Sequence, residues 1–190
     1  VAEYKGKIDP KDYGNFLVMV ATEYNDALLV VDNANIGWAT IQQILDRDYK
    51  NLFWSNRDVQ YVDVDTQFTN KWYREQKSMI PGFTISTKTR PMIISKIDAY
   101  MKDKSIIIHD KRTIDELFTF IWENGRAAAA KGYNDDLTMA LGIGLWVASI
   151  FNASASLSNA SALLSHCVCI ASAFFPHLAF AANRACSDLL

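Results

Sequence analysis

The stretch Asp26–Asp32, with the sequence DALLVVD, decides the fold class that the sequence predicts. Its apolar residues run without interruption between two acids, a pattern typical of a strand buried on both faces of a parallel sheet. Helical periodicity is found on either side, over residues 10–24 and 35–48, and short strands are predicted over 1–8 and 51–55. Strands that alternate with helices in this way predict an α/β fold with a largely parallel sheet.

The alternation continues further along the chain. Residues 56–86 are polar, aromatic and weakly periodic, so we expect a long loop or a β-excursion there. Helices are predicted over 89–103 and 111–124, with a strand, SIIIH, between them at 105–109. A last helix is predicted to begin at the motif NDD, residues 134–136, and to continue through an almost wholly apolar stretch.

The overall composition limits the classes of function. The chain has 190 residues, half of them hydrophobic, which is enough for one domain with a core and argues against disorder. The net charge is -2, so a contact with DNA has to come from a local basic patch. The cysteines, Cys167, Cys169 and Cys186, form neither a disulfide framework nor a zinc motif.

The character of the sequence changes after residue 147, where only Arg184 and Asp188 carry a formal charge. Three interpretations are open: a helical hairpin packed on the domain, a membrane segment over Ala162–Ala182, or a stretch translated out of frame. Polar residues dilute the candidate membrane segment, and the change is abrupt, so we favour the third. We therefore divide the chain into a domain over 1–147 and an atypical apolar tail, helical or disordered, over 148–190.

Asp32 is the first candidate site residue, because it ends the predicted buried strand. An acid at the carboxyl end of such a strand lies where α/β sheets bind ligands. A structural interpretation stands beside this one, in which Asp32 caps the following helix, a role that also suits Asn33 and Asn35. Position along the chain leaves both interpretations open.

Asp135 and Asp136 form the second candidate. With Asn134 as N-cap, acids in the first turn of a helix complement its dipole, which is a sufficient structural explanation. However, the helix that follows is apolar and has to pack closely, and two acids held against a core repel each other unless a cation lies between them. If Asp136 converges with Asp32, the layout suits a two-metal site for phosphodiester cleavage.

Basic residues gather at the start of the predicted helix over 89–103. Lys88 and Arg90 lie in the stretch STKTRP, and Lys96 follows one to two turns later. A helix start with an adjacent lysine and arginine is suited to holding a phosphate. A solvated helix start is the alternative, and the stretch itself does not decide between them.

Three segments together resemble a known family. ALLVVDNANIGWATIQQIL (27–45), GFTISTKTRPMIISKID (82–98) and GYNDDLTMALGIGLW (132–146), in this order and spacing, resemble the C-terminal nuclease domain of the large terminase subunit of tailed phages, most closely the T4-like group. The resemblance covers about residues 1–147. It implies an RNase H-like mixed sheet flanked by helices and truncated at the N-terminus, and a metal-dependent endonuclease that cuts concatemeric viral DNA during packaging.

The resemblance also implies roles for individual residues. Asp32 matches the second of three acids in the family, where many relatives have glutamate, and Asp136 or Asp135 matches the third. The first acid is expected upstream of this chain. The acids are expected to hold two Mg²⁺ or Mn²⁺ ions, while Lys88 and Arg90, with Lys96, contact the DNA backbone.

The implied partners belong to a larger protein. They are double-stranded viral DNA, an ATPase domain upstream in the same chain, and the portal and small terminase subunit, with no membrane partner. The expected location is the host cytoplasm, at the procapsid. Because one acid is expected upstream, we expect the isolated fragment to be an impaired enzyme, and the alternative is a catalytically incomplete RNase H-like module that binds DNA or docks on the motor.

Overall fold

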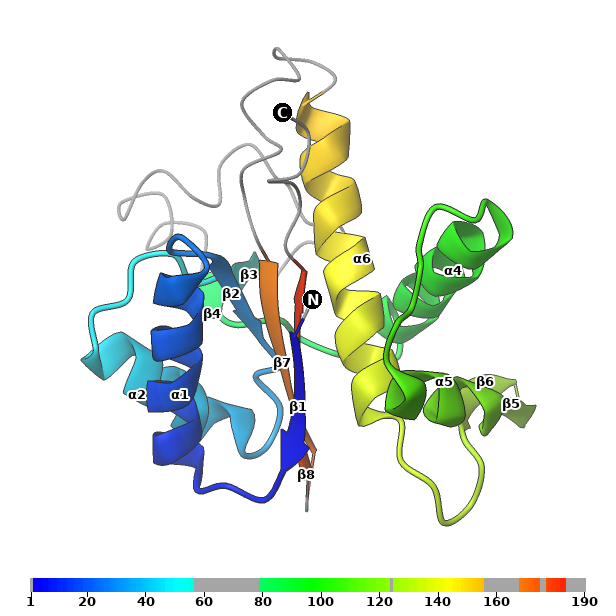
Figure 1. Cartoon of the computed structure of the whole chain (residues 1–190), viewed down its shortest axis with the longest axis horizontal. Helices are drawn as coiled ribbons and strands as arrows, with labels where there is room; N and C mark the ends of the chain where they lie inside the picture. The colour runs from blue at the N-terminus through cyan, green and yellow to red at the C-terminus, as the bar shows by residue number, and fades with distance from the viewer. Residues whose placement is uncertain (1, 57–78, 124, 156–167, 175–176, 184–190) are drawn as a thin grey trace.

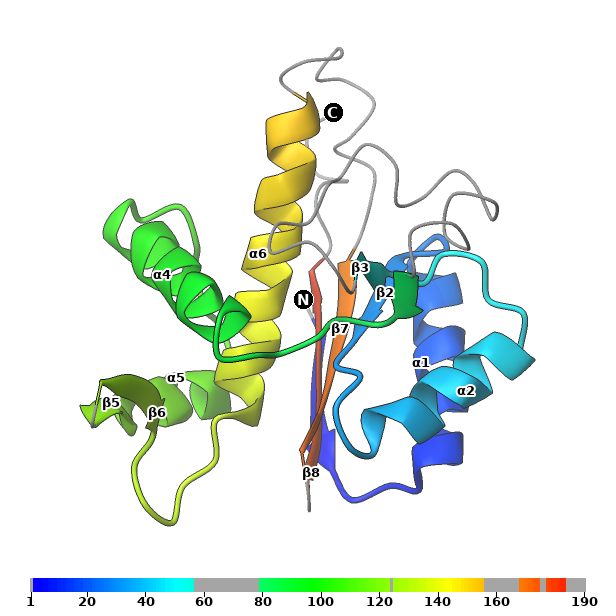
Figure 2. The same cartoon turned by 180° about the vertical axis from the view of Figure 1, so that it is seen from behind.

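The structure is a computed structural model, and it describes residues 2–56, 79–123, 125–155, 168–174 and 177–183. These residues form three layers, with helices packed on both faces of a central sheet (Figures 1 and 2). The mixed helix and strand content agrees with the predicted α/β class. None of the helices within the described ranges is long and apolar enough to cross a bilayer.

The central sheet is mixed rather than largely parallel. Its strands lie in the order β1 (Ala2–Gly6), β8 (His177–Asn183), β7 (Val168–Phe174) and β2 (Leu28–Val31). β1 pairs antiparallel with β8, β8 pairs antiparallel with β7, and only β7 and β2 are parallel. On its other side β2 forms parallel bridges at Leu29 with Leu52 and at Asp32 with Phe83.

Strand β2 is buried on both faces, as its apolar run predicts. Leu29 and Val31 belong to the hydrophobic cluster made with α1 and α2, whereas Leu28 and Val30 belong to the cluster made with α6 (Asp136–Ala155). Successive side chains of a strand point to opposite faces, so one uninterrupted apolar run supplies both layers of the core.

Helices α1 (Pro10–Glu23) and α2 (Gly37–Asp46) cover one face of the sheet (Figure 1). Asp9 is the N-cap of α1 and accepts a hydrogen bond from the Lys11 backbone N–H (2.9 Å), as the Asp9-Pro10 pair predicts. These elements follow local sequence patterns closely, and both predicted helices are confirmed.

Helix α6 covers the opposite face, and α4 (Thr89–Lys102) packs against α6 (Figure 2). Gly142 makes their close approach possible, since a Cβ atom there would overlap the side chains of Ile93 and Ile97. The apolar stretch after NDD is therefore a packing helix, as the sequence predicts.

The region between α4 and α6 differs from the prediction. Residues 105–109 belong to no described strand, and the helix predicted over 111–124 ends early, as α5 (Lys111–Phe118). It gives way to a hairpin of β5 (Phe120–Glu123) and β6 (Arg126–Ala129). The Asn-Gly pair at 124–125 is a strong hairpin signal that outweighs helical periodicity, and Gly125 has the positive φ (75°) of such a turn.

The residues after 147 also differ from the prediction. Helix α6 crosses the predicted division and ends at Ala155, and β7 and β8 lie in the middle of the central sheet. The expectation of a helical or disordered tail is therefore wrong for these strands. The rest of the membrane candidate Ala162–Ala182 lies outside the described residues, and a change of reading frame stays a prediction about the gene.

The turn that follows β4 (Met79–Pro81) brings the chain back against β2. β4 pairs with β3 (Trp54–Asn56), and most of the predicted excursion between them lies outside the described residues. Gly82 then adopts a φ of 84°, and a Cβ there would lie 2.6 Å from the Val31 carbonyl oxygen. This conformation allows Phe83 to donate its N–H to the same oxygen (2.7 Å), beside Asp32.

Gly82→Ala is expected to lower the free energy of unfolding by about 3 kcal/mol, because the methyl group adds a backbone overlap to the cost of a positive φ. Gly125→Ala is the matched control, since Gly125 has a similar φ (75°) but nothing within 4 Å of its Cβ position. It should cost only about 1 kcal/mol. Equal losses in urea unfolding would contradict the assigned overlap.

Candidate functional site

The predicted acids lie at one end of the sheet. Asp32 directly follows the carboxyl end of β2, and Asp136 is the first residue of α6, with Asp135 just before it. In both views this end of β2 and the start of α6 lie toward the same end of the molecule (Figures 1 and 2). Phe83 and Met139 share a hydrophobic cluster with Val30, which packs the segments carrying these acids around one core.

Asp32 is completely buried. Its Oδ1 accepts a hydrogen bond from the Ala34 N–H (3.1 Å), while Oδ2 has no hydrogen-bond partner among the described residues. Burial raises the pKa of Asp32 from 3.8 to about 6, and the backbone N–H groups of Ala34 and Ile85 oppose this rise. A buried carboxylate oxygen without a donor is costly, so its position calls for a cation or a proton.

Asp32 does not cap the following helix. The N-cap of α2 is Ile36, and no side chain accepts a hydrogen bond there. Asn33 has a different role, because its side-chain amide donates to the Pro81 carbonyl (3.2 Å) and to Thr84 Oγ1 (3.0 Å). Asn33 thereby holds residues 81–84 beside Asp32 through hydrogen bonds. The interpretation of Asp32 and Asn33 as caps of the following helix is wrong.

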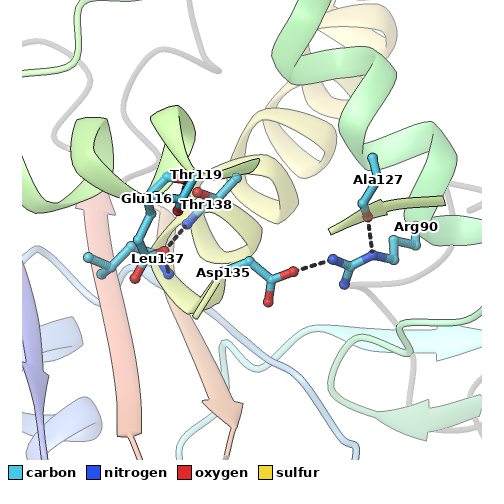
Figure 3. Close-up of polar contacts among 7 residues, drawn as sticks. All are labelled: Arg90, Glu116, Thr119, Ala127, Asp135, Leu137 and Thr138. Carbon is cyan, nitrogen blue, oxygen red and sulfur yellow. Dashed lines mark hydrogen bonds and ion pairs between the residues drawn. The ribbon is translucent and has the colours of Figure 1, made fainter. Parts of the chain in front are cut away.

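The start of α6 is capped from another helix. Glu116, on α5, accepts hydrogen bonds at Oε2 from the backbone N–H groups of Leu137 (2.8 Å) and Thr138 (3.1 Å), as Figure 3 shows. This carboxylate satisfies two of the donors that every helix start leaves open, and it complements the helix dipole. Asn134, the predicted N-cap, lies two residues before α6, which begins at Asp136.

Asp135 is held by an arginine. Its Oδ2 forms an ion pair with the Arg90 guanidinium, whose Nε donates to the Ala127 carbonyl (3.2 Å) (Figure 3). The guanidinium also lies 6.0 Å from the centre of the Phe120 ring. Both side chains are largely buried, with 8% of Arg90 and 16% of Asp135 exposed. Arg90, which the sequence predicts as a DNA-phosphate contact, thus has several protein partners.

Asp136 is the other acid of the NDD motif, and it is buried, with 4% of its surface exposed. Because the Asp135 carboxylate is engaged by Arg90, the two neighbouring acids have different environments. The sequence left open which of them matters more. The structure distinguishes them by the deeper burial of Asp136 and by the ion pair of Asp135 with Arg90.

The other predicted basic residues lie near the surface. Lys88 is exposed and Lys96 is half-buried. Ser86 accepts hydrogen bonds at Oγ from the N–H groups of Lys88 (3.2 Å) and Thr89 (3.0 Å), so these donors at the start of α4 are already bound. A phosphate at this place would be held by lysine side chains rather than by free helix amides.

Among the described residues, no group of three or more histidine, cysteine, aspartate or glutamate side chains is arranged to hold a metal ion. The structure brings the predicted acids to one end of the sheet, with Asp32 and Asp136 buried and Asp135 half-buried. Glu116 and the Arg90–Asp135 pair were missed from the sequence, because their partners come from other elements. No protein-family model matches this chain, and no curated protein matches it.

Glu116→Ala is expected to lower the free energy of unfolding by about 1–2 kcal/mol, the usual cost of losing a helix cap. Glu116→Gln keeps an acceptor oxygen and should lose less. Glu123→Ala, at an exposed glutamate of β5, controls for removal of an acid. Urea unfolding measures all three, and a Glu116→Ala loss no greater than that of Glu123→Ala would refute the capping role.

Proposed function

We propose that this chain is an RNase H-like nuclease domain related to the phage large terminase subunit, a metal-dependent endonuclease for double-stranded DNA. The observation that carries the proposal is the buried Asp32 carboxylate at the carboxyl end of β2, with one oxygen lacking a partner among the described residues. Such an oxygen is what a hard cation binds, since Mg²⁺ and Mn²⁺ prefer carboxylate ligands.

A second observation supports the same proposal. The three segments that resemble the family are joined in space by polar contacts. Asn33 of the first bonds to Thr84 of the second (3.0 Å), and Arg90 of the second forms an ion pair with Asp135 of the third. The motifs thus meet at one end of the sheet, as they would if they formed a single site.

The acids differ in how well they suit a metal. Asp32 fits, because its Oδ2 is buried and has no donor among the described residues, and Asp136 fits by its place at the start of α6. Asp135 fits less well, because its Oδ2 is engaged by a cationic side chain, that of Arg90. When bound, divalent ions supply an activated water and stabilise the leaving 3′-oxygen.

The remaining residues hold this arrangement and face the substrate. Arg90 and Glu116 fix the start of α6. The exposed Lys88 would contact the DNA backbone, together with Lys96 further along α4. Such phosphate contacts carry no base code, so cleavage with little sequence preference follows. The same proposal includes the partners of the full-length protein: the portal, the small terminase subunit and an ATPase domain in the same chain. These would act at the procapsid in the host cytoplasm.

Manganese should bind and support nicking by the 190-residue chain. At pH 8, where Asp32 is ionised, saturating Mn²⁺ is expected to add about 3 kcal/mol to the free energy of unfolding at a hundredfold excess over its Kd. We also expect slow, Mn²⁺-dependent nicking of supercoiled plasmid. Both effects should be lost in Asp32→Asn and in Asp136→Asn, and kept in Asp12→Asn, which changes an exposed acid on α1.

The two readouts separate the candidate functions. If Mn²⁺ produced no stability shift and no nicking, the metal site itself would be refuted. Metal-dependent stabilisation and DNA binding without nicking would favour the alternative, a catalytically incomplete DNA-binding module.

A further inference from the structure

The segment Ser105–His109, SIIIH, belongs to no helix and joins no sheet among the described residues, and its side chains are alternately exposed and half-buried, as in an extended chain. It follows Lys104, whose φ is 52°, and it leads into α5 through Asp110. The backbone groups from Ile106 to His109 form no hydrogen bond within the described part of the chain. An extended backbone without partners is a template for pairing with another strand.

The side chains of this segment alternate as in a strand. Ile106 and Ile108 are half-buried and line a cavity of about 420 Å³ between the end of α4 and α5. Ile107 points the other way and is 76% exposed. Phe118, which also lines the cavity, is 83% exposed, so both faces of the segment present apolar surface.

The sequence around Ile107 is complementary to itself. When two copies of KSIIIHD (104–110) run antiparallel with Ile107 opposite Ile107, Ile106 of one copy lies opposite Ile108 of the other. Lys104, whose positive φ turns the chain just before the segment, and Asp110, just after it, then come near each other at both ends of the pairing, so opposite charges meet there. Directly opposite residues of antiparallel strands interact, and both apolar and opposite-charge pairs are stabilising.

We propose that Lys104–Asp110 is a homodimer interface, in which these segments of two copies pair as antiparallel strands about a two-fold axis at Ile107. Pairing would satisfy the backbone groups of Ile106 to His109, which a helical partner could not do because its own backbone is already paired. It would also cover Ile107 and extend the apolar cavity of each copy with the partner's isoleucines. A two-fold interface between identical patches is the commonest form of oligomer.

The end charges are placed to select this register. Lys104 lines the cavity, and its side chain has no ion pair among the described residues. Asp110 accepts a hydrogen bond at Oδ2 from the Thr113 N–H (2.6 Å) at the start of α5, and its Oδ1 lies 3.9 Å from Arg112 Nε. The side chain of Asp110 nevertheless remains 32% exposed. A lysine of the second copy can therefore approach Asp110 while the cap on α5 is kept.

Charge exchange tests the interface. Sedimentation equilibrium of the full chain should show a reversible dimer, and Lys104→Glu should raise its Kd at least about tenfold, because a glutamate then faces Asp110 at both ends. Lys11→Glu makes the same charge change on α1, on the other side of the sheet, and should leave the Kd unchanged (Figure 1). Asp110→Lys should also weaken self-association.

Mixing the two variants gives the decisive result. A Lys104→Glu chain with an Asp110→Lys chain restores opposite charges at both ends, so the mixture should dimerise at least about tenfold more tightly than either variant alone. Loss of the α5 cap cannot produce this rescue. A chain that stays monomeric, a Kd that Lys104→Glu does not raise above that of Lys11→Glu, or a mixture no tighter than its components would overturn the proposal.

Discussion

Arg90→Met is expected to lower the free energy of unfolding by about 3 kcal/mol, because it leaves the largely buried Asp135 carboxylate without its partner. The loss is larger than that of one surface ion pair, since Arg90 also donates to the Ala127 carbonyl and lies over the Phe120 ring. The substitution thus removes the polar contacts that α4 makes with the β5–β6 hairpin and with the residue before α6. Urea unfolding at neutral pH measures the change.

Two comparisons make the Arg90 result specific. Adding Asp135→Leu to Arg90→Met should recover most of the loss, because no buried charge then lacks a partner. Lys50→Met removes one member of the Lys50–Asp48 pair, whose side chains are 79% and 80% exposed, and should cost less than about 1 kcal/mol. If Arg90→Met lowered the free energy of unfolding as little as Lys50→Met, the stabilising role of the Arg90–Asp135 ion pair would be refuted.

Asp32→Asn is expected to make the protein more stable at pH 8 while removing its metal-dependent behaviour. The rise of the Asp32 pKa from 3.8 to about 6, at about 1.4 kcal/mol for each pKa unit, corresponds to about 3 kcal/mol. The raised pKa means that the folded state holds this proton more tightly than the unfolded state. The contribution of Asp32 to stability is therefore fully present below pH 3.8 and is lost as the pH rises through 6.

Asparagine keeps the shape of the protonated acid, so the gain from Asp32→Asn should be largest above pH 7 and should shrink toward zero near pH 4. Urea unfolding across this range, in the presence of a chelator, gives the difference at each pH. Asp12→Asn, at an exposed position of α1, should show no comparable dependence. A gain that does not change with pH would mean that burial of the charge is not its cause.

The parts of the fold that the sequence predicted are those set by neighbouring residues. The apolar run in β2, the Asp9-Pro10 helix start of α1 and the amphipathic pattern of α2 each determine their element locally. For the same reason, local sequence is enough to place Asp32 at the carboxyl end of a buried strand. Local sequence does not predict the complete burial of its carboxylate, because that burial depends on the 81–85 segment folding over it.

The parts that were missed depend on contacts between distant residues. Glu116 caps α6 from 21 residues upstream, and Arg90 reaches Asp135 across 45 residues, so no local window contains both partners. The β5–β6 hairpin had a readable signal, the Asn-Gly pair, which the helical periodicity of the preceding residues obscured. In the apolar tail, composition gave no means of recognising strands whose partners lie in β1 and β2.

The place of β8 beside β1 has a consequence for how the chain folds. Ala2 pairs with Ala182, so the first strand meets its hydrogen-bonded neighbour only after about 180 further residues have been made. Contacts of such large sequence separation slow folding, because a long loop has to close before they form. During synthesis on the ribosome, β1 has to remain unpaired while α1, β2 and α2 assemble behind it. The central sheet is therefore expected to be completed in the last step of folding, when β8 pairs with β1.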